Sequence, residues 1–305
     1  MSELAADVQT DSGWLARRRF RWSTSSKARR GRVPFAALAG AAWLIAAAIC
    51  ALFAQQIAPH DPIHQNLFER NIPPIWQSDG SWSHIFGTNA LGQDLFSRVV
   101  WGSRPALAIG AAAVICSMII GTTLGLVCGF FRGRIDSAIM ALADAQLSMP
   151  FLVLALAIVS VLGRSTAILI LLAGISGWMG FAREIRSQVL SLSTRDYVMA
   201  SRSFGATNLH LMIRHVLPNV MPIVIVLVTN SIAGMILFES TMGFLGMGIP
   251  APQPSWGSMI SDGRDYLLSQ WWLSVEPGVA LILTVVACSL IGDWLRDRLD
   301  PMLRN

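Results

Sequence analysis

The chain has 305 residues, of which 53% are hydrophobic and only 13% are charged, and its mean hydropathy is +0.54. Soluble domains carry about 25% charged residues, so this composition excludes an ordinary soluble protein and indicates a membrane protein. The net charge of +5 comes almost entirely from arginine, since Lys27 is the only lysine. In a membrane protein such an excess marks cytoplasmic loops rather than a nucleic-acid surface. The four cysteines lie in apolar runs without ligand spacing, so we predict no metal site, disulfide framework or cofactor.

Residues 1–33 form a polar leader with a basic cluster, and the apolar run 34–57 follows directly. This run exceeds the roughly 7–15 residues of a signal-peptide core, so we predict an uncleaved helix. It is long enough to cross a hydrocarbon layer of about 30 Å. Further apolar stretches lie at 106–131, 135–162, 166–181, 223–238 and 280–294. The sequence therefore predicts an all-α membrane protein with six transmembrane helices.

Arginine placement assigns a side of the membrane to each polar segment. Residues 1–33, the stretch 183–214 and the tail 295–305 are rich in arginine, whereas the segment 58–105 contains more acids than arginines. The positive-inside rule predicts that both termini are cytoplasmic and that 58–105 is a periplasmic loop. Residues 106–294 then form a five-helix core.

The cytoplasmic segment 195–218 is too polar to span a membrane and too regular for a linker. Thr194 is expected to cap a first short helix, and Gly205 to end it in the left-handed conformation. A second helix is expected to begin near Asn208 and to end at Pro218. Its apolar positions share one face: Leu209, Met212, Ile213 and Val216. Such a projection fits either a membrane surface or a groove on a partner protein.

This segment resembles the coupling loop, or EAA loop, of binding-protein-dependent importer permeases. That family has Glu-Ala-Ala, three residues, Gly, and then an Ile/Val-Leu-Pro ending. The matching positions here are Met199, Ala200, Ser201, Gly205, Val216, Leu217 and Pro218. Met199 replaces the glutamate and Ser201 replaces the second alanine, so any salt bridge made by that glutamate is absent. The resemblance implies that the loop, through its apolar face, docks into a groove on an ATP-hydrolysing subunit.

Other short motifs resemble the dipeptide/oligopeptide/nickel branch of that family, and in particular its second, C-type permease subunit. They are HIFGT at 84–88, GQD at 92–94, PSWG at 254–257, GD at 292–293 and LDP at 299–301. The resemblance implies a type I ABC importer permease fold in the bacterial inner membrane. It also implies a heterodimer with a second homologous permease, two ATP-hydrolysing subunits, and a periplasmic or lipid-anchored solute-binding protein. The implied solutes are di- or oligopeptides, with nickel chelates, glutathione and opine-like solutes as alternatives.

Two other classes were weighed against this interpretation. The chain has no P-loop, HExxH motif or nucleophile elbow, so we predict no catalytic residue and no ATPase activity of its own. An intramembrane enzyme would need a Ser/Lys or paired-Asp arrangement at membrane depth, and the only close approach, Asp136 with Asp144, separates the two acids by about 12 Å along a helix. An ion-driven transporter or channel would show inward-facing charge on several spans and inverted repeats. Asp144 shortly precedes Pro150, which resembles the pattern of the family. We expect Asp144 to form an ion pair or hydrogen bond with a neighbouring helix; the alternative is that it lies in the translocation path.

Overall fold

The computed structural model describes residues 34–299, so the leader 1–33 and the last residues of the tail lie outside the described part. Over that range it contains helices and no β-strand. They are α1 (Phe35–Leu52), α2 (Ala54–Ile57), η1 (Leu67–Glu69), α3 (Leu95–Phe131), α4 (Gly133–Leu147), α5 (Phe151–Leu162), α6 (Thr166–Leu192), α7 (Asp196–Ser203), α8 (Asn208–Leu211), the π-helix η2 (Met212–Val216), α9 (Leu217–Phe244), α10 (Trp256–Gly263), η3 (Arg264–Tyr266) and α11 (Trp272–Leu299).

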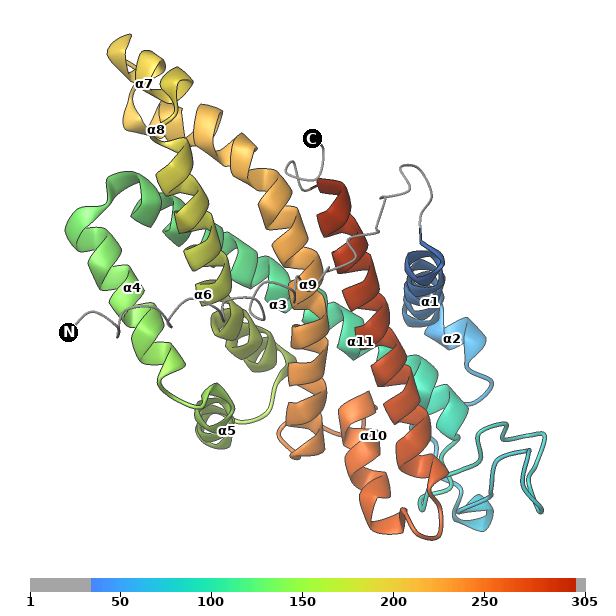
Figure 1. Cartoon of the computed structure of the whole chain (residues 1–305). Coiled ribbons are helices and arrows are strands. Elements are labelled where there is room, and N and C mark those ends of the chain that lie inside the picture. The colour runs from blue at the N-terminus through green and yellow to red at the C-terminus, as the bar shows by residue number, and fades with distance from the viewer. Residues whose placement is uncertain (1–33, 300–305) are drawn as a thin grey trace, which may run out of the picture. The chain divides into compact units, whose positions relative to one another are not determined.

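Five helical stretches among the described residues are long and apolar enough to cross a membrane, and there are six if α4 and α5 count as one bent crossing. They are α1, α3, α6, the continuous helix Asn208–Phe244 and α11. Figure 1 shows α3 crossing behind α6, α9 and α11; α6 and α9 pack against α3, α11 packs against α9, and α1 packs against α11. The predicted all-α membrane fold is confirmed.

Most spans extend beyond the boundaries predicted from hydropathy. α3 begins at Leu95 instead of 106, because Asp94 caps it: Asp94 Oδ2 accepts a hydrogen bond from the Ser97 amide at 2.8 Å. α6 runs past 181, while α9 and α11 are longer at both ends. α1, in contrast, ends at Leu52 and a separate turn, α2, follows. Apolar windows locate the lipid-embedded centre of a helix, whereas capping decides where its hydrogen bonds end.

The prediction of one continuous helix at 135–162 is wrong, because the chain bends sharply within this range. It consists of α4 and α5, which meet at an angle of 84°. Pro150 stands at the break and is the N-cap of α5. Proline lacks the N–H for helical pairing and disfavours helical geometry in the residue before it. At about 18 Å, the 12-residue α5 is too short to cross a bilayer alone.

Small residues bring α3 and α6 into close contact. A Cβ added to Gly125 of α3 would lie 2.7 Å from the Ala182 carbonyl oxygen of α6, and one added to Gly129 would lie 2.6 Å from Cβ of Val189. Glycine at these positions allows the two backbones to approach closely, as membrane helices commonly do. This rigid pair carries the segment between α6 and α9 at one end of the helices, opposite to α10 and residues 58–94 (Figure 1).

Candidate functional site: a helical projection between α6 and α9

The projection, residues 195–218, begins with α7 and a glycine turn. Arg195 is the N-cap of α7 and makes no side-chain cap, so the predicted cap at Thr194 is wrong; the Thr194 hydroxyl instead donates to the Ser191 carbonyl at 2.9 Å. Gly205 has φ +85°, which confirms the predicted left-handed stop. Its amide donates to Arg202 O at 3.0 Å and the next amide donates to Ser201 O at 3.2 Å, the pairing of a Schellman motif.

The second half of the projection is continuous with a transmembrane helix. The side chain of Thr207 caps α8 by accepting a hydrogen bond from the amide of His210 at 3.3 Å. The chain then passes through η2 into α9, so that Asn208–Phe244 is one helical stretch. The predicted helix end at Pro218 is therefore wrong: Pro218 lies just after the π-helical turn η2, inside this continuous stretch. A π-turn locally rearranges the helical hydrogen bonds, and helices commonly accommodate a proline at such a place. Any force on α8 acts directly on α9.

The inner face of the projection packs into the protein. Val198 of α7, Leu211 of α8 and Val216 of η2 are all fully buried, and they form one cluster with residues from the ends of α3 and α6. Met212 is half-buried against the same cluster. The prediction that Met212 and Val216 share an outward docking face with Leu209 and Ile213 is therefore wrong for Val216. The cluster joins the projection firmly to α6 and α9.

The outer face of the projection is apolar and exposed. It comprises Tyr197, Met199, Phe204, Leu209 and Ile213, which we call the outer patch. Phe204 is 91% exposed, although it stands beside the glycine turn. Large apolar side chains left open to water carry an unfavourable free energy, so several of them on one short segment mark a surface that a partner or a membrane covers.

The positions that match the EAA pattern have separate environments. Met199 and Ala200 are exposed, while the Ser201 hydroxyl lies 3.4 Å from His215 Nε2 and thereby links α7 to η2. Leu217 is half-buried and Pro218 is exposed at the start of α9. The two residues that depart from the EAA pattern therefore differ in position: Met199 is exposed on the surface, whereas Ser201 makes an internal contact with His215.

Comparison with known proteins matches this arrangement to a family. The model for "Binding-protein-dependent transport system inner membrane component" matches residues 121–305, which contain the whole projection, and the model for "N-terminal TM domain of oligopeptide transport permease C" matches residues 36–74. The chain belongs to the binding-protein-dependent permease family. The permease is thus an inner-membrane transport component, and in this family ATP hydrolysis and solute binding are the tasks of partner proteins.

Several relatives of the permease carry names for peptide transport. The di/tripeptide transport system permease protein DppC of Pseudomonas aeruginosa is 42% identical, over 88% of this chain and 89% of the relative. The dipeptide transport system permease protein DppC of Bacillus subtilis is 37% identical, over 88% and 82%. The oligopeptide transport system permease protein OppC of the same organism is 35% identical, over 88% and 86%.

Ion pairs hold the bent helix α4 of the permease against α6. Asp144 pairs with Arg183, which is the ion pair to a neighbouring helix expected from the sequence. Asp136 forms a second, bidentate ion pair with Arg186, in which the Oδ1–Nε distance is 2.5 Å and the Oδ2–Nη2 distance is 2.7 Å. This second pair was not predicted from the sequence. Opposite charges on two adjacent spans were the available signal.

Proposed function

We propose that this permease forms one half of the translocation pathway of an ATP-driven peptide importer. The other half would be a second, homologous permease, with two ATP-hydrolysing subunits on the cytoplasmic side and a solute-binding protein outside. The peptide names of the relatives, at 35–42% identity, support the substrate class. The observation that carries the coupling role is the continuous helix from α8 through α9, with the exposed outer patch at its end.

The projection would transmit movements of the ATPase subunits to the helices that line the translocation pathway. The buried contacts of Val198, Leu211 and Val216 join it to α3, α6 and α9, so it cannot swing without moving these helices. Closure of the ATPase dimer would displace the outer patch, and α9 would carry the displacement into the membrane. The ion pairs Asp144–Arg183 and Asp136–Arg186 would keep α4 moving with α6.

The outer patch favours a protein groove over the lipid surface. A helix that lies on a bilayer needs a dense basic rim, but the whole projection, residues 195–218, has three arginines (Arg195, Arg202 and Arg214), no lysine, and the acid Asp196. Burial of the five side chains would remove a few hundred Å² from water, which corresponds to several kcal/mol at roughly 25 cal/mol per Å² before association costs. Because Met199 stands where the family has glutamate, this docking would depend on apolar contact more than on a salt bridge.

This proposal places the projection and both termini in the cytoplasm and residues 58–94 outside. The arginines of the stretch 183–214 support that orientation under the positive-inside rule. Figure 1 supports it as well, since the ends of α6 and α11 lie on the side of the projection.

The docking proposal is tested with the double variant Leu209→Asp/Ile213→Asp. Both side chains are exposed, at 66% and 56%, so the fold should tolerate the change while the ATPase groove should not. We expect the variant to lose the ATPase subunits during purification of the complex and to lose ATP-dependent uptake. The matched control is Leu268→Asp, a fully exposed leucine between η3 and α11. If the double variant retains its ATPase subunits as the control does, the outer patch is not the docking surface.

The substrate class is tested by uptake in reconstituted vesicles that contain the whole importer and its binding protein. Labelled di- and tripeptides should accumulate with ATP, and unlabelled peptides should compete. Competition by glutathione, an opine or a nickel chelate, without competition by peptides, would replace the peptide assignment with one of those solutes.

A further inference from the structure

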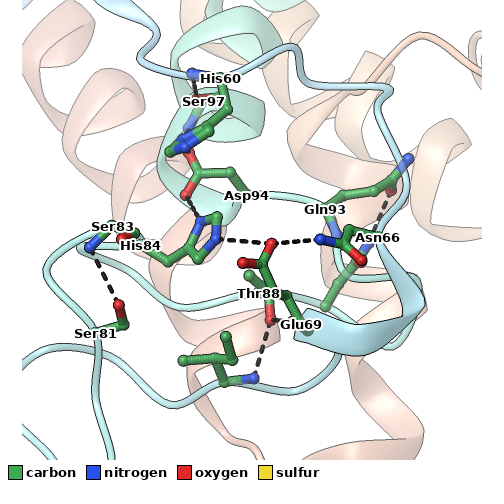
Figure 2. Close-up of polar contacts among 12 residues, drawn as sticks. His60, Asn66, Glu69, Ser81, Ser83, His84, Thr88, Gln93, Asp94 and Ser97 are labelled. Atoms are coloured by element: carbon green, nitrogen blue, oxygen red, sulfur yellow. Dashed lines mark hydrogen bonds and ion pairs between the residues drawn. The ribbon is translucent and has the colours of Figure 1, made fainter.

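Residues from three places in the chain meet at the start of α3 (Figure 2), on the side of the molecule away from the projection (Figure 1). His60 follows α2, His84 lies in the middle of the segment 58–94, and Asp94 caps α3. His84 Nδ1 lies 2.9 Å from Asp94 Oδ1, and His60 Nδ1 lies 3.8 Å from Asp94 Oδ2. Their nitrogen and carboxylate oxygen atoms all lie within 4.8 Å of one another.

Further polar contacts surround these side chains, as Figure 2 shows. The other ring nitrogen of His84, Nε2, lies 3.6 Å from Glu69 Oε2, and the Asn66 amide donates to that same oxygen at 2.8 Å. On the other side, the Ser97 hydroxyl accepts a hydrogen bond from the His60 amide at 3.1 Å. At 2.9 Å, His84 Nδ1 and Asp94 Oδ1 share a proton, because a carboxylate can only accept. When a cation displaces that proton, the remaining proton of His84 lies on Nε2, toward Glu69, and the Nδ1 lone pair is free to bind the cation.

We propose that His60, His84 and Asp94 bind one Zn²⁺ ion. Two imidazoles and one carboxylate are a zinc ligand set, and a carboxylate on the far nitrogen of a ligating histidine is its usual support. Bonds of about 2.0–2.2 Å in a tetrahedral site place the ligand atoms about 3.4 Å apart. His84 Nδ1 and Asp94 Oδ1 would therefore separate slightly from 2.9 Å, and His60 Nδ1 would approach Asp94 from 3.8 Å by rotation of the ring. Zinc would take the place of the proton shared by His84 and Asp94, as metal binding to imidazole generally does.

The surroundings of the cluster favour a cation. Asp94 is joined by a second carboxylate, since Glu69 Oε2 lies 3.6 Å from His84 Nε2. Neighbouring carboxylates repel one another, and a divalent ion nearby offsets that repulsion.

His60 and His84 differ in solvent exposure, and this difference provides an entry path for the zinc ion. The His84 side chain is 6% exposed and that of Asp94 1%, whereas that of His60 is 41% exposed. Zinc would enter past His60, and the open side leaves a coordination position for water. Once bound, it would tie both ends of the segment 58–94 to the start of α3. This is a role in the stability of that segment, separate from the coupling proposed for the outer patch.

The test is a zinc titration of the full-length permease, purified with its partners through a tag without histidine and stripped with a chelator. Zn²⁺ is added against a fluorescent zinc indicator, in excess Mg²⁺. The wild type should bind one zinc more tightly than His84→Asn or His60→Asn, each of which removes a ligand. Glu69→Gln should weaken binding by about 10- to 100-fold, since it removes the support of His84 and not a ligand. His64→Asn, an exposed histidine of the same segment, is the matched control and should bind as the wild type does.

Two results would overturn the proposal: absence of zinc binding by the wild type, or binding that survives in both ligand variants. His60→Asn keeps the test decisive if His84→Asn does not fold, because the His60 ring is partly exposed. Thermal unfolding of the wild type should also shift upward with zinc, and that shift should disappear in His60→Asn but remain in His64→Asn.

Discussion

Adding a Cβ atom at Gly205 should impair coupling to the ATPase subunits while the protein still folds. It has φ +85°, and a Cβ built there meets no atom of the described residues within 4 Å. A larger side chain therefore has room, and its whole cost lies in the backbone. A left-handed conformation costs about 1–2 kcal/mol for a residue with a Cβ, and more for a β-branched one. If the chain escapes that strain, it must break the hydrogen bonds from the amides of Gly205 and Ala206, at roughly 0.5–1.5 kcal/mol each.

Backbone strain and the loss of these hydrogen bonds each cost roughly 1–3 kcal/mol of free energy. A cost of that size reduces the population of permease able to dock to the ATPase by about 5- to 150-fold. We expect a graded series in ATP-dependent uptake and in ATPase co-purification at equal membrane levels. Gly205→Asn should be mildest, because asparagine tolerates the left-handed region, Gly205→Ala intermediate, and Gly205→Val most severe.

Gly163 provides the matched control, because it also has φ +85° and open space around its Cβ among the described residues. It lies in the turn between α5 and α6, away from the projection. Gly163→Val should lower thermal stability by a similar amount yet retain the ATPase subunits. The reasoning is refuted if the Asn, Ala and Val variants of Gly205 are equally impaired, or if Gly205→Val transports normally.

Two further predictions follow from helix packing and topology. Gly125→Ala would place a Cβ 2.7 Å from the Ala182 carbonyl oxygen, so it should destabilise the α3–α6 pair by roughly 1–3 kcal/mol and lower the unfolding temperature, whereas Gly180→Ala, with open space at its Cβ, should not. In a variant without native cysteines, Ser269→Cys should react with an impermeant thiol reagent added to intact spheroplasts and Asn208→Cys should not; the reverse labelling would contradict the proposed orientation.

Local physical chemistry made much of this protein readable from its sequence. Apolar runs longer than a bilayer is thick predict helices that span, and arginine placement predicts a topology. The stop at Gly205 was predictable as well, because a glycine after a short helical pattern commonly takes the left-handed conformation. These features depend on residues close together in the chain, so no knowledge of the folded molecule was needed for them.

Helical periodicity could not decide which part of an apolar face is buried. Val216 and Ile213 lie on the same predicted face, yet Val216 packs against α3 and α6 while Ile213 is 56% exposed. The pattern of one helix reports only that its face is apolar, and the neighbours that cover it come from distant helices. The predicted end of the second short helix at Pro218 was wrong for a related reason, since the π-turn η2 continues through Pro218 into α9.

Tertiary structure alone brought together the groups that meet across long separations in the chain. His60, His84 and Asp94 have no recognisable ligand spacing, and they converge because the segment 58–94 folds back onto the start of α3. Arg186 meets Asp136 because the glycines of α3 and the bend at Pro150 place α4 beside α6. The sequence determines which residues carry the charge, but only close packing of the helices decides which opposite charge each one meets.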